Sequence, residues 1–192
     1  MVLAAGLARR MGRDKLGLML GGKPVIRQVA ETVLAACLHE VIVVINPRSG
    51  DAIREALHGL PLGFVCNDRF EEGIASSIAT GAAAVPSGCE AMILVQGDQP
   101  LVTSEMLRAL FDAWREGGSE FVAAAYDGVI TTPVLFGRAL FGELEALSGD
   151  TGARSVLGRH KGRTISFPQW RGIDLDTDQD YARVQRIWAT LV

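Results

Sequence analysis

The sequence has few of the residues that build cross-linked or zinc-binding domains. Only three cysteines and three histidines occur among its 192 residues. Cys37, Cys66 and Cys89 lie far apart, and none stands near a histidine at the spacing of a metal site. This argues against a disulfide scaffold or zinc centre, and a scattered, odd set of thiols is typical of a reducing compartment. Because Cys37 and Cys66 adjoin apolar runs, we expect both to be small core residues.

Long apolar runs and basic stripes are also missing. The strongly apolar runs, such as residues 41–45, are far too short to span a bilayer. Arg9 and Arg10 interrupt the N-terminus before the apolar core of a signal peptide could form. The formal net charge is −3, and no basic stripe suited to a polyanion is visible. We therefore expect a cytoplasmic protein that binds neither membrane nor nucleic acid.

What the sequence does contain is an ordinary globular composition, with 48% hydrophobic and 21% charged residues. A chain of 192 residues fits one domain better than two. No repeat, low-complexity tract or linker divides it. We therefore expect a single domain over residues 1–192.

Short apolar segments alternate with longer amphipathic ones. Strands are predicted at residues 1–4, 41–45, 62–66, 91–96, 121–126, 133–136, 164–167 and 172–176, and helices at 24–36, 51–57, 74–84, 104–116, 138–147, 153–159 and 179–191. The alternation predicts βαβ units and an α/β fold with a doubly wound, mostly parallel sheet. Ligands bind such sheets beyond the carboxyl ends of the strands, so the segments that follow the strands are the candidates for a site.

The first predicted strand runs into the segment AAGLARRMGRDK. Its small residues let a ligand approach the backbone, and Arg10 and Lys15 could neutralise a triphosphate. The GxGxxG pattern fails because Gly6 and Gly12 have no third glycine, and the P-loop pattern fails because Arg13 follows Gly12. From chemistry alone, an anion site and a solvated charged loop are equally favoured.

Two acidic segments also follow predicted strands. Asp98 lies in GDQP after an apolar strand, where a carboxylate is costly without a cationic partner such as Mg²⁺. Asp178 and Asp180 suit a helix N-terminus, because acidic side chains there interact favourably with the helix dipole. Asp174 and Asp176 fall at the preceding strand end, where their repulsion needs relief. Asp98 and Asp176 together could hold one or two Mg²⁺ ions through carboxylate oxygens.

Five motifs, taken in order, resemble those of the molybdopterin nucleotidyltransferases. They are LAAG-x-x-x-RMG-x-x-K at the start, EG-x-x-SS, GDQP, GD-x-GAR at 149–154 and D-x-DT-x-x-DY near the end. Together they extend over nearly the whole chain, and the ordered set is far more specific than any one motif. The opening Ala4-Ala5-Gly6, GDQP and the final D-x-DT are more similar to the CTP:molybdopterin cytidylyltransferases than to the guanylyl branch, which tends to have AGG.

The resemblance implies a nucleotide-diphospho-sugar transferase-like version of the Rossmann-type fold and a role for each motif. Arg10 and Lys15 would bind the triphosphate and act in catalysis with Asp98. Asp98 and Asp176 would hold Mg²⁺. The other motif residues would line the base and phosphate pocket (Ala4, Ala5 and Gly6), contact the nucleoside (Gly73, Ser76 and Ser77) or lie on the acceptor side (Asp150, Gly152 and Arg154).

Three positions depart from the family's pattern. Ala8 stands where serine is common, which removes one hydroxyl contact, and Ile74 replaces a frequent methionine. Thr132 precedes Pro133 where histidine is common, so the acceptor pocket differs at this point.

The function that the resemblance implies is an Mg²⁺-dependent transfer of CMP from CTP to molybdopterin, with release of pyrophosphate. A guanylyltransferase using GTP, and a transferase for a sugar phosphate or another phosphorylated acceptor, are alternatives within the same fold. A non-catalytic carrier that hands molybdopterin to a molybdoenzyme apoprotein is an alternative from another class. The intact set of two cationic and two carboxylate side chains counts against the carrier, which would need no pair of metal-binding carboxylates.

Overall fold

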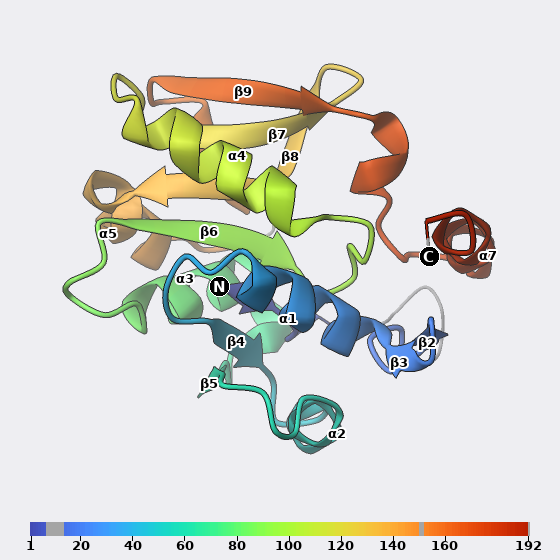
Figure 1. Ribbon diagram of the computed structural model, residues 1–192. Helices are drawn as coiled ribbons and strands as arrows, with labels where there is room; N and C mark the ends of the chain where they lie inside the picture. Colours follow the sequence, from blue (N-terminus) through green and yellow to red (C-terminus); the bar gives the residue numbers. More distant parts are fainter. Residues whose placement is uncertain (7–13, 150–151, 192) are drawn as a thin grey trace.

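The computed structural model describes residues 1–6, 14–149 and 152–191. Its centre is a seven-stranded sheet in the order β5-β4-β1-β6-β8-β7-β9 (Figure 1). The strands are β1 (Val2–Leu3), β4 (Ile42–Ile45), β5 (Gly63–Cys66), β6 (Ala91–Gln96), β7 (Phe121–Tyr126), β8 (Val129–Gly137) and β9 (Gly162–Phe167). All neighbours pair in parallel except β8, which is antiparallel to both β6 and β7. This confirms the predicted α/β fold with a mostly parallel sheet.

Helices cover both faces of the sheet. In Figure 1, α1 (Val25–Ala35) and α4 (Ser104–Arg115) lie on the near face, and α3 (Ile74–Ala83) and α5 (Phe141–Glu145) lie behind it. Val2 of the central strand packs in the cluster of α1, and Leu3 packs in the cluster of α3. Successive strand residues point to opposite faces, so a strand covered on both faces is apolar throughout. That is why the run of apolar residues, without alternation, was a reliable signal.

Three further helices and three short 3₁₀ helices complete the described chain. They are α2 (Gly50–Ala56), α6 (Arg154–Leu157), α7 (Asp178–Trp188), η1 (Phe70–Glu72), η2 (Arg138–Leu140) and η3 (Gln169–Gly172). The segment predicted as one helix at 138–147 is η2 followed directly by α5 and ends at residue 145, and the helix predicted at 153–159 is reduced to α6. Within the described residues, no helix combines the length and the apolar character needed to cross a membrane.

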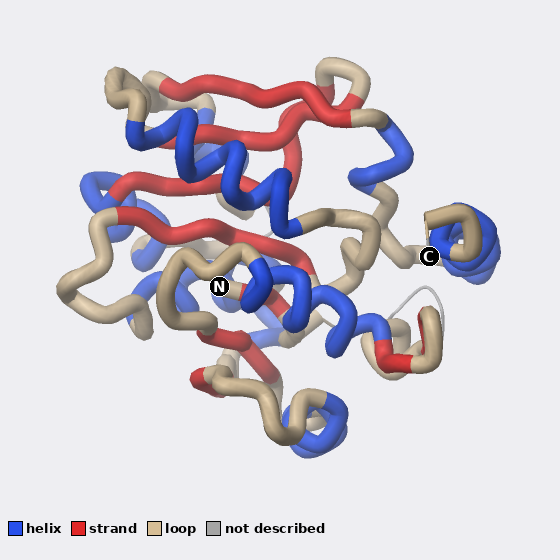
Figure 2. The backbone as a smooth tube through the Cα atoms, in the orientation of Figure 1, coloured by secondary structure: helices blue, strands red, loops and turns tan. Residues whose placement is uncertain are grey.

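A small C-terminal layer lies beyond the carboxyl end of the sheet (Figure 2). Here α7 packs beside the hairpin of β2 (Met19–Leu20) and β3 (Lys23–Pro24), through a separate apolar cluster that includes Leu20 and Val184. The Tyr181 hydroxyl donates a hydrogen bond of 2.6 Å to the Met19 carbonyl. This layer ties the segment after Lys15 to the helix after Asp176.

The strand predicted at 172–176 is wrong. Residues 169–172 form η3, and residues 173–176 form no strand. Ile173 and Leu175 alternate with polar residues because they enter the cluster under α7, not because they pair in the sheet. The expectation that Asp178 and Asp180 lie at a helix N-terminus is confirmed, because both fall in the first turn of α7. Thr177 and Asp180 also form a reciprocal capping box there.

The strand predicted at 133–136 is the second half of a longer β8. It forms a hairpin with β7 through Asp127 and Gly128, whose φ angles of 50° and 78° suit a tight hairpin turn. The pairing register shifts between Ala123 and Ala124, opposite the stretch that contains Pro133. A proline lacks the N–H of a ladder bond and is tolerated at such a bulge, so it did not mark the strand's beginning.

The expectation that Cys37 and Cys66 are core residues is wrong, because both are exposed. Cys37 has a positive φ of 52° just after α1. Cys66 ends the edge strand β5, where its thiol lies 3.6 Å from Oδ1 of Asp68. Neighbouring apolar sequence therefore did not imply burial at either position.

Candidate active site

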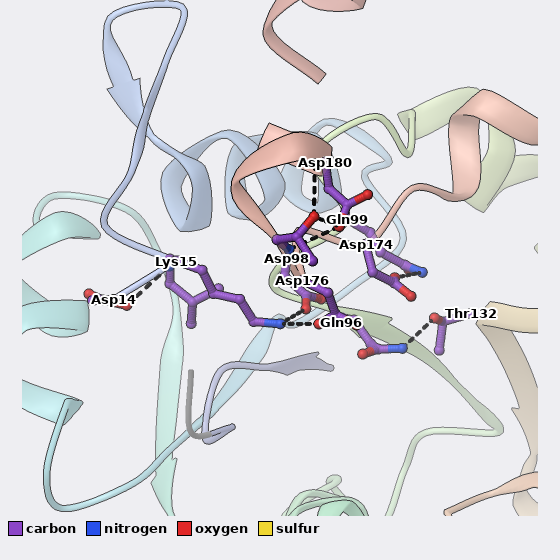
Figure 3. Close-up of polar contacts among 11 residues, drawn as sticks. Asp14, Lys15, Gln96, Asp98, Gln99, Thr132, Asp174, Asp176 and Asp180 are labelled. Atoms are coloured by element: carbon purple, nitrogen blue, oxygen red, sulfur yellow. Dashed lines mark hydrogen bonds and ion pairs between the residues drawn. The ribbon is translucent and has the colours of Figure 1, made fainter. Parts of the chain in front are cut away.

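Three charged side chains meet where β1 and β6 end. Lys15 follows the first loop, Asp98 comes two residues after β6, and Asp176 precedes α7 (Figure 3). The Lys15 ammonium donates to Oδ2 of Asp98 and, at 3.1 Å, to Oδ1 of Asp176. Asp98 is buried, while Lys15 and Asp176 are partly buried. Residues far apart in sequence thus converge on one point, as parallel strand ends do in this class of fold.

Close packing brings Asp98 to this point. A side chain at Gly97 would place its Cβ 2.8 Å from the Leu3 carbonyl oxygen and 2.9 Å from Cδ1 of Ile26. Such contacts are too short, so the GDQP turn can approach β1 only with glycine at this position. The following carboxylate is thereby held directly beside the end of the first strand.

Two hydrogen bonds position Asp176. The Leu175 amide donates to the Asp98 carbonyl at 3.1 Å, and Nε2 of Gln99 donates to Oδ1 of Asp174 at 2.7 Å. Leu175, which lies between Asp174 and Asp176 in the sequence, is fully buried. The expected repulsion between Asp174 and Asp176 is relieved because one accepts from an amide and the other pairs with an ammonium.

Burial and neighbouring charges set the pKa values here. Burial opposes the charge of Lys15, but the carboxylates of Asp98 and Asp176 outweigh it and raise its pKa above 10.5. Burial raises the pKa of Asp174 to about 6, and the nearby charge of Asp98 acts in the same direction. Lys15 therefore keeps its proton more tightly than a solvated lysine, whereas Asp174 ionises less readily than a solvated aspartate.

A pocket of about 320 Å³ opens beside these charges, between the end of β1 and the start of α3. Seven of the residues singled out in the sequence line it: Ala4, Ala5, Gly6, Lys15, Gly73, Ser77 and Asp98. Arg10 and Asp150 lie outside the described residues. The lining combines small residues, which let a ligand approach the backbone, with the Lys15 ammonium and the carboxylates of Glu71, Glu72 and Asp98.

The paired serines differ in what they can offer a ligand. Nδ2 of Asn67 donates to the hydroxyls of both Ser76 and Ser77, each at 2.9 Å. Ser76 also lies within 2.8 Å of the Arg69 carbonyl and 2.9 Å of the Gly73 carbonyl, and it does not line the pocket. Ser76 therefore fixes the turn before α3, and Ser77 is the serine that faces the pocket.

Two buried asparagines support the site and were not predicted. Asn46, directly after β4, donates to the Ala5 carbonyl at 3.0 Å and accepts from the amides of Arg48 and Ser49. Asn67, directly after β5, plays the corresponding part for α3. A polar residue immediately following an apolar strand was the available signal in both cases.

These elements match a known family. The model of the MobA-like NTP transferase domain matches residues 1–164 of the chain. The chain belongs to the MobA-like NTP transferase family. Its fold is accordingly the nucleotide-diphospho-sugar transferase-like one, and the protein is an enzyme of the nucleotidyltransferase type.

Full-length relatives support the assignment. The chain is 31% identical to the purine catabolism protein PucB of Bacillus subtilis, with 96% of this chain and 94% of the relative covered. It is also 31% identical to a molybdenum cofactor guanylyltransferase of Cereibacter sphaeroides, covering 97% and 95%. A crystal structure of Rv0371c from Mycobacterium tuberculosis superposes with a TM-score of 0.87 at 29% identity, covering 96% and 95%.

Two carboxylates, those of Asp98 and Asp176, lie side by side in the site of this MobA-like protein. Among the described residues, no group of three or more His, Cys, Asp or Glu side chains gathers as a metal site. Asp98 and Asp176 nevertheless already share one cation, the Lys15 ammonium, so their oxygens converge on a single position. Two carboxylates leave room for water and phosphate oxygens, the coordination Mg²⁺ prefers beside nucleotides. Rv0371c has also been crystallised as a manganese complex.

Of the positions expected on the acceptor side, Gly152 and Arg154 fall within the described residues. Arg154 begins α6 and is exposed outside the pocket. Gly152 has a φ of 56°, and a Cβ there would lie 3.3 Å from Cγ2 of Ile74 at the pocket rim. Gln96, which also lines the pocket, donates to the Thr132 hydroxyl at 3.0 Å. Gly152 thus lies against a residue that lines the pocket.

Proposed function

We propose that this protein transfers CMP from CTP to molybdopterin, releases pyrophosphate and requires Mg²⁺. The observation that carries the proposal is the convergence of Lys15, Asp98 and Asp176 beside a pocket that several small residues help to line. The acceptor follows from the molybdopterin-related relative and from the motifs that extend along the chain. The choice of CTP rests on the Ala4-Ala5-Gly6 opening and on GDQP.

The reaction needs positioning more than proton transfer. The terminal phosphate of molybdopterin is already an anion, so one of its oxygens attacks the α-phosphorus of CTP without a general base. The new bond joins that oxygen to the α-phosphorus. The bond between the α-phosphorus and the oxygen that bridges it to the β-phosphorus breaks, and pyrophosphate leaves with that oxygen. Catalysis then consists of alignment and stabilisation of negative charge.

Each site residue has a defined part in this proposal. Mg²⁺ held by Asp98 and Asp176 would neutralise charge on the reacting phosphates. The Lys15 ammonium, together with Arg10, would stabilise the departing pyrophosphate. Ser77 and the backbone at Gly73 would contact the nucleoside.

The other predicted positions complete the proposal. Ala4, Ala5 and Gly6 would lie against the base and phosphates, and Asp150 and Arg154 would receive the acceptor. One catalytic domain over residues 1–192 would carry all of these steps. In the cytoplasm, the product would pass to a molybdoenzyme apoprotein.

A guanylyl activity is the second candidate, because a relative of 31% identity is named a molybdenum cofactor guanylyltransferase. Pyrophosphate release with molybdopterin and Mg²⁺ separates the two when CTP, GTP, ATP and UTP are compared. We expect release with CTP and little with the others. Release with GTP alone would replace cytidylyl by guanylyl transfer. Nucleotide binding without release from any of the four would favour a different acceptor or the carrier.

Asp98→Asn tests the metal-binding carboxylate. The variant keeps the side chain's shape and removes its charge, so we expect kcat to fall about 10²- to 10³-fold, as for the loss of other preorganised electrostatic groups. A kcat near that of the wild type would show that Asp98 has no part in the reaction.

A further inference from the structure

The Lys15 ammonium already occupies the position where the two carboxylates converge. It donates to Oδ2 of Asp98 and lies 3.1 Å from Oδ1 of Asp176. In the proposed function, the same carboxylates hold the metal ion while the same lysine binds phosphate. The Lys15 ammonium and the metal ion would therefore compete for the same position between the two carboxylates.

We propose that Lys15 and the divalent cation bind the Asp98–Asp176 pair in alternation. The ammonium is the counter-ion of the two carboxylates before substrate arrives. It moves to the nucleotide phosphates when the metal takes its place. This inference rests on the proposed function. It adds that the binding of the metal ion and the binding of the nucleotide are coupled through Lys15.

The carboxylate pair needs a cation at all times. Asp98 is only 7% exposed, and a buried carboxylate without a partner is costly. Lys15 meets that need in the structure described here. A divalent cation meets it equally well, but the two cations repel each other at contact distance and cannot both sit between the same two carboxylates.

The lysine can leave without a change in its backbone. The Leu16 amide donates to Oδ1 of Asp14 at 3.0 Å, which fixes the turn around Lys15. The flexible four-carbon stem can then reorient the ammonium from this fixed point. Lys15 also lines the pocket that includes Ala5 and Gly6, so a new anionic partner would be within reach.

The alternation makes metal and nucleotide bind cooperatively. Without nucleotide, a metal ion has to displace Lys15 from both carboxylates and leave the ammonium without them. With nucleotide present, the displaced ammonium gains phosphate oxygens. Each ligand should therefore raise the affinity for the other by the same factor, because such coupling is reciprocal.

Mn²⁺ binding, followed by electron paramagnetic resonance, tests the coupling without turnover. We expect the α,β-methylene analogue of CTP to tighten Mn²⁺ binding to the wild type at least about five-fold, beyond the binding of Mn²⁺ by the analogue itself. Lys15→Met should bind Mn²⁺ more tightly than the wild type when no nucleotide is present. In this variant the further gain from the analogue should largely disappear.

Lys23→Met is the matched control. Lys23 is half-exposed and pairs with Glu31 at 2.6 Å, so the variant loses the same charge without touching the carboxylate pair. Its Mn²⁺ affinity should match the wild type. Equal affinities of the wild type and Lys15→Met for Mn²⁺, or a weaker affinity of Lys15→Met, would overturn the alternation.

The wild-type protein alone keeps the proposal testable if Lys15→Met fails to fold. Independent binding of Mn²⁺ and the analogue would contradict the alternation while leaving the transferase function intact. Failure to bind either ligand would overturn both the alternation and the proposed function.

Discussion

The side-chain amide of Gln99 lies 2.7 Å from Oδ1 of Asp174 and joins the turn after β6 to the segment before α7. Gln99 is fully buried, and its Oε1 atom has no hydrogen-bond partner among the described residues. The Gln99–Asp174 bond and the bond from the Leu175 amide to the Asp98 carbonyl together join the segments that hold Asp98 and Asp176. The role of Gln99 is to position the carboxylates rather than to contact substrate.

Gln99→Leu should destabilise the protein by about 1–3 kcal/mol, because Oδ1 of Asp174, which is partly buried, would lose its donor. Urea unfolding measures the change. Asp174→Asn is the control, since its side-chain oxygen can still accept from Gln99, and it should cost much less. Equal losses in the two variants would show that the hydrogen bond is not what matters at this junction.

Ser77→Ala and Ser76→Ala should have different effects on nucleotide affinity. Ser77 faces the pocket, so its loss should weaken CTP binding by up to about ten-fold, the value of one hydrogen bond. Ser76 is engaged with Asn67 and two carbonyls, so its loss should lower stability and leave affinity nearly unchanged. Calorimetric titration with CTP distinguishes the serines, and equal affinities for the two variants would contradict their separate roles.

Gly21→Ala should loosen the C-terminal layer. The residue has a φ of 58°, and an added Cβ would lie 2.4 Å from Nε1 of Trp188 in α7. Gly22→Ala is the matched control, because its φ is 80° but the space around it is open. Both should lose about 1–2 kcal/mol through the left-handed backbone, and Gly21→Ala about 1–3 kcal/mol more through overpacking. Similar unfolding free energies would mean that the Trp188 contact is not close.

His160 bridges two glutamate side chains at the protein surface, and this bridge should depend on pH. Its Nδ1 lies 3.0 Å from Glu120 and its Nε2 2.7 Å from Glu143. The hydrogen bond to Glu120, and then that to Glu143, raises the pKa of His160 above 6.5. The pKa values of both glutamates lie below 4.5, chiefly through the Lys161 amide at Glu120 and through Arg159 at Glu143.

The bridge should stabilise the protein most between about pH 4.5 and 6.5. The contribution of His160 is complete below its unfolded pKa and is lost as pH rises through its raised folded pKa. The glutamates contribute above their unfolded pKa and lose that contribution as pH falls. Between about pH 6 and 8, the Tm of His160→Gln should therefore fall less with pH than that of the wild type. Parallel Tm curves would rule the bridge out as a source of pH dependence.

Sequence reasoning worked best where burial alone decides structure. The strand β4, and β6 up to its last residue Gln96, are apolar because helices cover both of their faces. Asp98 stood out because a carboxylate after such a strand needs a partner, and Lys15 provides it. The alternating segment before Asp176 was wrongly predicted to be a strand. Its alternation arises because Ile173 and Leu175 enter the cluster under α7 without any strand pairing.

The missed features depend on contacts distant in sequence. Strands β2 and β3 have two residues each, too few for a periodic pattern, and they are held in place by α7. Asn46 and Asn67 gain their roles only when β1 and α3 come beside them. The difference between Ser76 and Ser77 likewise appears only in the folded turn, because adjacent serines look alike in sequence.

The most direct test of the central claim follows the labelled phosphorus atom. The protein is incubated with molybdopterin, Mg²⁺ and CTP labelled at either the α- or the γ-phosphate, and the pterin product is isolated. Nucleotidyl transfer predicts that the α label enters the pterin and that the γ label leaves as pyrophosphate. Transfer of the γ label to the pterin, or a pterin without either label, would contradict the account.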